Sequence, residues 1–376
     1  MVQKPIYLDH NATTPIASSV FDAMLPYLKH QYANPSSKHI LGYESQKGVE
    51  KARQQLADLL QVDTDEIFFT SGATEAINFV AHNTKHALTY YNAAEHKAVL
   101  EAMWGIRHRI PIDSNGYLEL DHQLMTADHS RFSDISNCLV IILANNETGV
   151  IQPIRSLIKD LPKDNFIIFS DATQAVGKIP VYPRQLGVDV MAMSAHKFYG
   201  PKGVGALYIR KDLQENMSPL LYGGGQEQGL RAGTLNVPGI VGMGAAAKLA
   251  KATMRDNALI VGMMRDAFEA EMMEVGGICI NGTTANRLYN TSNLRIEGIL
   301  ADDLLQLCGR QICFSTGSAC SSDSNKPSHV LRAMGLSAKE AWSSARFSFG
   351  VENTMEEVTK AAGMLKVAIE KLRNSV

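Results

Sequence analysis

Short apolar runs alternate with longer amphipathic stretches through the middle of the chain. The runs are continuous and rich in β-branched and aromatic residues, which is typical of strands that a sheet buries on both faces. Strands separated by helix-length segments predict an α/β architecture with a mostly parallel sheet flanked by helices. We expect strands at 66–70, 139–144, 166–170, 188–194 and 205–210, with a helix at 73–81.

The pattern changes beyond residue 237. Apolar residues there recur at helical spacing with charged residues between them, which predicts a long helix or helix pair leading out of the sheet. This helical pattern extends over 237–274, and it is followed by a strand at 288–296 and helices at 300–307 and 354–372.

Chain length sets the number of domains. At about 150 residues per domain, 376 residues predict two to three domains. The change of pattern favours two, a large sheet domain at 16–255 and a smaller α+β domain that joins 1–15 to 256–376. A chain of this length buries a core without needing disulfides or metals.

Opposite charges nearly balance, since 36 Lys and Arg against 38 Asp and Glu leave a net charge of −2. A protein that binds nucleic acid or a membrane surface directly would carry a basic excess, so we expect neither partner. The N-terminus does not read as a signal peptide. The longest strongly apolar run, 139–144, is far shorter than the roughly 18 residues of a membrane helix. We therefore expect a soluble, cytoplasmic protein.

The chain has five cysteines. This number is small and odd, which argues against the disulfide scaffold of a secreted protein. No CxxC pair occurs, so we expect no structural zinc and no other metal. Cys320 differs from the other four because it lies in a segment, 314–326, of small and polar residues that predicts an exposed loop. Cys320 is then either an incidental loop thiol or a mobile nucleophile. The others are Cys138, Cys279, Cys308 and Cys313.

Two polar segments follow predicted strands. The segment 70–75 stands where a strand meets a helix, so its free N–H groups would bind phosphate, or it is a simple helix cap. The segment 170–174 ends a strand in the carboxylate of Asp171, which either points into a ligand site at the carboxyl edge of the sheet or caps the next segment.

A lysine follows a third strand. Lys197 lies among small and aromatic residues in 193–203. Desolvation there would lower the pKa of its amine and favour a Schiff base. Neither a P-loop nor a dinucleotide glycine fingerprint is present. A phosphate cradle, a carboxylate and a Schiff-base lysine together describe a site for pyridoxal phosphate.

Several motifs occur in order along the whole chain, namely 7–15, 34–37, 94–99, 145–149, 223–227, 231–234, 315–320 and 343–348. With these motifs the chain resembles the cysteine desulfurases. These are pyridoxal-phosphate enzymes of the class V aminotransferase group, with fold type I, which implies a seven-stranded sheet. The long Ser-rich segment around Cys320 resembles the subgroup that serves iron–sulfur assembly.

The resemblance implies a role for each site residue. Lys197 would hold the cofactor and move protons at the substrate Cα, and Asp171 would pair with the pyridinium nitrogen. Gln174 would bond the phenolic oxygen, and His96 would lie against the ring as an acid–base group, unless it is merely a capped loop histidine. The phosphate would be held by Ala73, Thr74, Ser194, His196 and, from the partner subunit of a homodimer with shared sites, Thr234.

The resemblance also implies the reaction. Asn146 and Arg346 would bind the carboxylate of L-cysteine. Cys320 would take the substrate sulfur as a persulfide, release L-alanine and pass the sulfur to an acceptor protein for iron–sulfur assembly or nucleic-acid thiolation. Selenocysteine lyase remains an alternative on the same scaffold. Cys320 argues against a small-amino-acid aminotransferase, and intact Lys197 argues against a catalytically silent relative.

Overall fold

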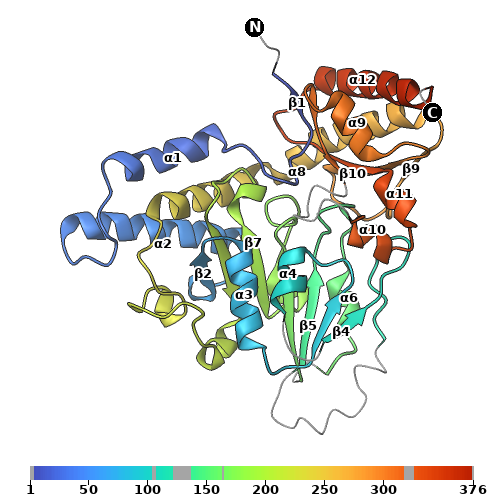
Figure 1. Ribbon diagram of the computed structural model, residues 1–376. Coiled ribbons are helices and arrows are strands. Elements are labelled where there is room, and N and C mark those ends of the chain that lie inside the picture. The colour runs from blue at the N-terminus through green and yellow to red at the C-terminus, as the bar shows by residue number, and fades with distance from the viewer. Residues whose placement is uncertain (1–3, 104–106, 122–136, 163–164, 317–325, 375–376) are drawn as a thin grey trace.

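A seven-stranded sheet forms the centre of the protein in the computed structural model (Figure 1). The structure describes residues 4–103, 107–121, 137–162, 165–316 and 326–374. Strand β8 is antiparallel to both of its neighbours, and the pairs from β7 to β4 are parallel. The expected mostly parallel sheet is therefore confirmed. In spatial order the strands are β2 (Ile67–Thr70), β8 (Gly205–Ile209), β7 (Val190–Ser194), β6 (Phe166–Asp171), β5 (Asn137–Ile142), β3 (Thr89–Asn92) and β4 (Arg107–Ile110).

Both faces of this sheet are buried, which explains why its central strands read as continuous apolar runs. In β5, Cys138 and Val140 belong to the core on one face, whereas Leu139 and Ile141 belong to the core on the other. The first face is covered by α3 (Ala73–Asn83) and α4 (Lys97–Ala102). The second is covered by α2 (Ile40–Leu60) and the first half of α8 (Val237–Met273).

Strand β3 and the edge strand β4 beside it are absent from the sequence-based expectations. Strand β4 has the sequence Arg-His-Arg-Ile, and only its last residue is buried. An edge strand with one buried position gives no apolar run, so the sequence carries too weak a signal to detect it.

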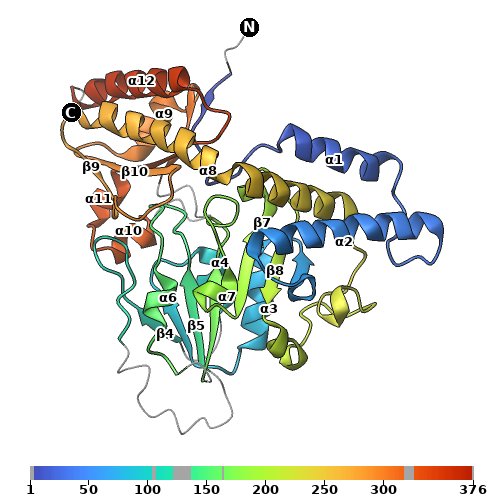
Figure 2. The ribbon, with the colours of Figure 1, turned by 180° about the vertical axis from the view of Figure 1, so that it is seen from behind.

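Helix α8 joins two hydrophobic cores (Figure 2). Ile240 and Met243 in its first half pack under the large sheet, and Met264 and Phe268 in its second half pack in a separate core. The long helix expected at 237–274 is thus confirmed. A domain boundary at residue 255 would fall inside this continuous helix, so the division into 16–255 and 256–376 stays a prediction.

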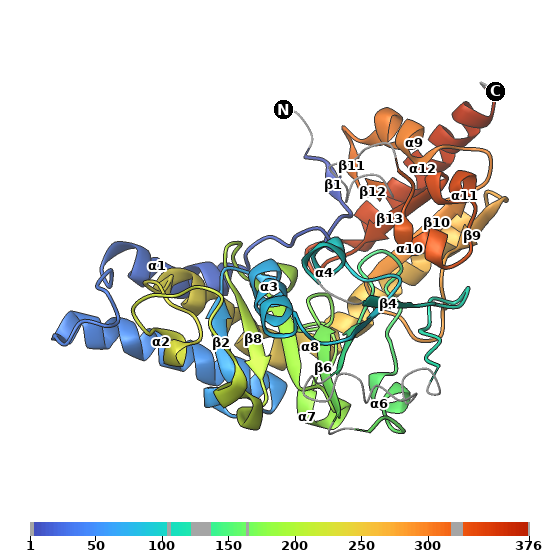
Figure 3. The same ribbon diagram turned by 60° about the horizontal axis from the view of Figure 1, so that its bottom comes forward.

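The second core lies under a four-stranded antiparallel sheet at the other end of α8. The strand β1 (Ile6–Tyr7) pairs in parallel with β11 (Ile312–Cys313) beside it, so a segment near the N-terminus lies with elements from the last third of the chain (Figure 3). In order, the four strands are β12 (Ser315–Thr316), β13 (Ser344–Ser348), β10 (Thr291–Ile296) and β9 (Ile278–Ile280).

Helices α9 (Ala301–Cys308) and α12 (Met355–Arg373) cover this second core, and both agree with the sequence-based expectations. In the part of the chain that the structure describes, no helix is long and apolar enough to cross a bilayer. The other α-helices of the described residues are α1 (Ser18–Lys29), α6 (Ile154–Leu157), α7 (Pro183–Leu186), α10 (His329–Ala333) and α11 (Ala338–Trp342).

Candidate active site

A cavity of about 540 Å³ lies at the carboxyl ends of the central strands. It is also lined by residues of the N-terminal segment and of β13, so both cores contribute to its walls. Thr234 is exposed and does not line the cavity, and Cys320 lies outside the described residues. The other sequence-predicted residues all line it, namely Ala73, Thr74, His96, Asn146, Asp171, Gln174, Ser194, His196, Lys197 and Arg346.

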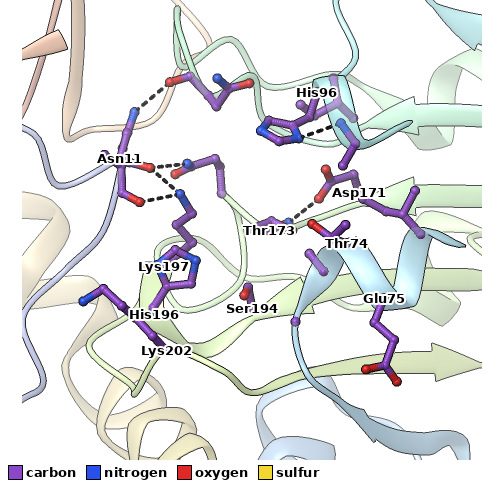
Figure 4. Close-up of a pocket in the computed structure, with 18 of the residues that line it drawn as sticks. Asn11, Thr74, Glu75, His96, Asp171, Thr173, Ser194, His196, Lys197 and Lys202 are labelled. Carbon is purple, nitrogen blue, oxygen red and sulfur yellow. Dashed lines mark hydrogen bonds between the residues drawn. The ribbon is translucent and has the colours of Figure 1, made fainter. Parts of the chain in front are cut away.

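Lys197 is held at one wall of the cavity. It ends a short 3₁₀ turn, Ala195–Lys197, that directly follows β7. Its Nζ donates to the main-chain oxygens of Asn11 and Ala12, each at 2.7 Å. Figure 4 shows the amine reaching toward Asn11, with His96 and Asp171 across the cavity. Two carbonyl acceptors fix the position of the amine before any ligand arrives.

Asp171 is the last residue of β6 and is nearly buried. Its Oδ1 accepts from the N–H of Thr173 at 2.9 Å, so the capping role left open by the sequence is real. Asp171 also lines the cavity, so among the described residues its second oxygen is available to a ligand. The carboxylate therefore both caps the following turn and lines the cavity.

His96 likewise combines two roles. It precedes α4, and its Nδ1 accepts from the N–H of Ala98 at 3.1 Å, which makes it the N-cap of that helix. Because Nδ1 is an acceptor, the neutral ring carries its proton on Nε2. Desolvation lowers the pKa of His96, and Lys197 and His329 lower it further, while Asp171 opposes them. The ring is thus a neutral N–H donor in the cavity wall.

The N-terminus of α3 forms the end of the cavity beside β7. Gly72, the residue before the helix, has no side chain to cap the first N–H groups of the helix. The turn lies directly on β8, since a Cβ on Gly205 would come within 2.6 Å of the Gly72 Cα. Ser194 and His196 line the same end, where uncapped N–H groups and the helix dipole favour an anion.

Charge around His196 is positive. Burial lowers the pKa of His196 to about 4, and Lys197, Lys202 and Lys178 contribute to the fall. Its Nδ1 lies 3.1 Å from the Thr13 hydroxyl. A neutral histidine surrounded by lysines is a region of unbalanced positive potential, and an anion bound there would restore the balance.

Arg346 approaches the cavity from β13. Its Nη1 donates to the main-chain oxygen of Asn146 at 3.0 Å, and its Nη2 donates to Asp9 at 2.6 Å and to Ser315 at 2.8 Å. The guanidinium is thereby oriented by both halves of the protein. A second carboxylate that reached Arg346 would share it with Asp9.

Several lining residues have no role among the sequence-based expectations. Asn11 accepts from Lys197, and Glu75 holds the N–H of Ser71 at 2.9 Å while it pairs with Arg231. Burial alone would raise the pKa of Glu75, but bonds from Arg231 and Ser71 outweigh burial and lower it. The signal for Asn11 was the polar stretch that follows the apolar run at 6–8.

The described cysteines lie in regular elements. Cys138 is buried in β5, and burial raises the pKa of its thiol to about 12. Burial also raises the pKa of Cys308 and Cys313, which makes their thiolates scarce. Cys279, in β9, is exposed.

Comparison with known proteins gives the family. The family described as aminotransferase class V matches residues 6–360. A cysteine desulfurase of Frankia sp. strain EuIK1 is 40% identical over 98% of this chain and 92% of its own. A solved NifS-like protein has a TM-score of 0.88 at 35% identity, covering 98% of this chain and 100% of its own. The structure titled SspA in complex with cysteine has a TM-score of 0.78 at 30% identity, covering 93% of this chain and 100% of its own. The chain belongs to the class V aminotransferase family and, within it, to the cysteine desulfurases.

Proposed function

We propose that this protein is a cysteine desulfurase that uses pyridoxal phosphate to take sulfur from L-cysteine. The observation that carries the proposal is that Lys197, Asp171 and the uncapped start of α3 line one and the same cavity. A related solved structure is described as a complex with cysteine, which supports this substrate.

The residues of the cavity fit each functional group of the cofactor. The amine of Lys197 suits its aldehyde, Asp171 suits its ring nitrogen, and the N-terminus of α3 with Ser194 and His196 suits its phosphate. When bound, pyridoxal phosphate supplies an electron sink for the bonds around the substrate Cα. The carboxylate of Asp171 supports this by keeping the ring nitrogen protonated.

The protein groups then position the substrate. Arg346, held by Asp9 and Ser315, presents its guanidinium to the substrate carboxylate, with the side chain of Asn146 beside it. With the cofactor and substrate bound, the amine of Lys197 would serve as the base for the Cα proton. His96, with its proton on Nε2, would offer an N–H donor to a ligand in the cavity.

Cys320 is the proposed sulfur acceptor within the chain. Its thiolate attacks the substrate sulfur, the substrate C–S bond breaks, and the electron pair of that bond stays with the carbon, which is protonated to give L-alanine. A thiol and L-cysteine thus become a persulfide and L-alanine, with every atom balanced. The outer sulfur then passes to an acceptor protein.

We further propose a homodimer with shared sites. Helices α1 and α2 project from the body of the protein (Figure 1) and expose large apolar side chains. The segment that carries Thr234 is bonded to α2 through Arg53 and Glu227. A second copy that covered α1 and α2 would bring its Thr234 toward this cavity. The exposed side chains include Phe21 and Leu28 on α1, Ile40 and Tyr43 on α2, and Tyr32 between the two helices.

Replacing Lys197 by Ala tests the cofactor assignment. Wild-type protein reconstituted with pyridoxal phosphate should be yellow, and borohydride should fix the cofactor's mass onto the peptide that contains Lys197. Lys197→Ala should be colourless with no fixed mass. Lys202→Ala, which changes another lysine of the same cavity, should keep both signals. A fixed cofactor in Lys197→Ala would refute the assignment.

Replacing Cys320 by Ala tests the sulfur step. The variant should keep the yellow cofactor but form no persulfide on the protein, and its sulfide release from L-cysteine should fall at least about a hundredfold, because the nucleophile is lost. Cys279→Ala removes an exposed thiol elsewhere and should behave as wild type. Persulfide is measured by mass spectrometry after alkylation, and full sulfide release by Cys320→Ala would sink the mechanism.

Sedimentation tests the homodimer. Sedimentation of the wild-type protein should give a mass of twice the 41.1 kDa of the chain. A Tyr32→Asp, Ile40→Asp double variant should be monomeric and bind pyridoxal phosphate more weakly, because charges would be buried in the interface. Leu259→Asp, on an exposed position of α8, should stay dimeric. A monomeric wild type with full cofactor affinity contradicts the proposal.

The pKa of His196 tests the phosphate end. Because folding lowers this pKa from 6.5 to about 4, the neutral ring stabilises the fold above pH 6.5, and that contribution is lost as the pH falls toward 4. Histidine NMR of the cofactor-free protein, assigned with His196→Gln, should show a midpoint near 4. Adding pyridoxal phosphate should raise it, since an anion favours the imidazolium. A midpoint near 6.5 without cofactor would show that neither burial nor the lysines lower this pKa.

A further inference from the structure

A buried lysine lies next to the cavity without lining it. The side chain of Lys178 is only 5% exposed, and its Nζ donates to the Oε1 of Gln174 at 2.6 Å. Burial, and then the charges of Lys197 and Arg346, lower the pKa of Lys178 well below its usual value. An amine donates an N–H in either protonation state, so the bond to Gln174 does not depend on the charge.

Gln174 extends this bond into the site. Its Nε2 donates to the main-chain oxygen of Asn11 at 2.8 Å, and the same oxygen accepts from the Nζ of Lys197 at 2.7 Å. Hydrogen bonds therefore connect Lys178 to Lys197 through one amide and one carbonyl. Turning the amide over would set its oxygen against the oxygen of Asn11, a mismatch whatever the charge of Lys178, and would set its NH₂ against the protonated amine of Lys178. The amide therefore favours one orientation, in which its oxygen accepts from Lys178.

The backbone around Gln174 and Lys178 is fixed as well. The two residues lie one turn apart, and the N–H of Lys178 donates to the oxygen of Ala175 at 3.0 Å. Gly177 adopts a φ of +80°, and a Cβ there would come within 2.4 Å of the Cβ of Phe198. Since Phe198 directly follows Lys197, this turn packs against the segment that carries the reactive amine.

We propose that Lys178 is a positioning residue that locks the amide of Gln174 with an N–H directed at the phenolic oxygen of the cofactor. The inference rests on the proposed function, because the phenolic oxygen belongs to pyridoxal phosphate. One N–H of Gln174 is used by Asn11, and the second serves the ligand in the cavity that Gln174 lines. A donor to the phenolic oxygen withdraws electron density and makes the nitrogen that links Lys197 to the cofactor less basic. Lys178 thereby adjusts that basicity without touching the cofactor.

Spectral pH titration of the reconstituted protein tests this role. Lys178→Met should raise the pH midpoint of the yellow absorbance band by about one unit, the size expected when one polar hydrogen bond is lost. Gln174→Leu should raise it at least as much. The double variant should not exceed Gln174→Leu, because Lys178 acts only through that amide. Lys178→Arg, which keeps a donor, should titrate closer to wild type than Lys178→Met.

The outcomes separate this inference from the proposed function. If wild type forms the yellow adduct but Lys178→Met titrates as wild type does, the positioning role is wrong and the desulfurase assignment stands. Additive shifts in the double variant also overturn the role, because they would show that Lys178 acts independently of Gln174. If wild type forms no adduct, the proposed function itself fails. Thermal melting confirms that each variant is folded. Should Lys178→Met not fold, Lys178→Leu, which also lacks a donor, takes its place in the same comparison.

Discussion

The parallel pairing of β6 with β7 is the constraint on which the site depends. Its register sets Asp171 beside Ala192, so both strands end at the same edge of the sheet. Asp171 closes one strand and the turn that carries Lys197 follows the other, which brings a carboxylate and an amine to one cavity although 26 positions separate them. A shift of β7 by one residue against β6 would turn every side chain of β7 to the other face of the sheet.

The N-terminal segment brings residues from the side of the second core into the wall of the cavity. Strand β1 is fixed to β11, and Asp9 bridges to Ser348, so the next residues are delivered to the cavity from the side of the second core. The carbonyls of Asn11 and Ala12 then receive the Lys197 amine. Any shift of one core against the other would move the acceptors of the reactive lysine. The geometry of the amine is therefore sensitive to the junction along α8.

Features that follow from the local pattern of apolar residues could be predicted from the sequence. Features that depend on contacts formed only in the folded protein could not. Buried strands such as β6 are recognised in the sequence as apolar runs. Asp171 and Lys197 were predicted as site residues because they lie where such runs end. The edge strand β4 does not, because it buries only Ile110. Lys178 gave no signal either, since its bond to Gln174 arises only when the turn closes on Phe198. That His96 both caps a helix and lines the cavity could be seen only in the structure, where the N–H of Ala98 donates to its ring.

The segment that carries Thr234 shows how the fold holds a strained loop in place. Glu227 and Gln228 adopt left-handed φ values of 48° and 56°, which non-glycine residues reach only at a cost of about 1 kcal/mol each. Arg53 offsets it with a two-pronged buried ion pair to Glu227, whose Oε2 also accepts from the N–H of Phe69 at 2.7 Å. The Arg231–Glu75 pair then connects the same segment to the start of α3. A segment fastened at both points yet exposed at Thr234 keeps that hydroxyl in a fixed place at the surface, which is what contact with a second subunit requires.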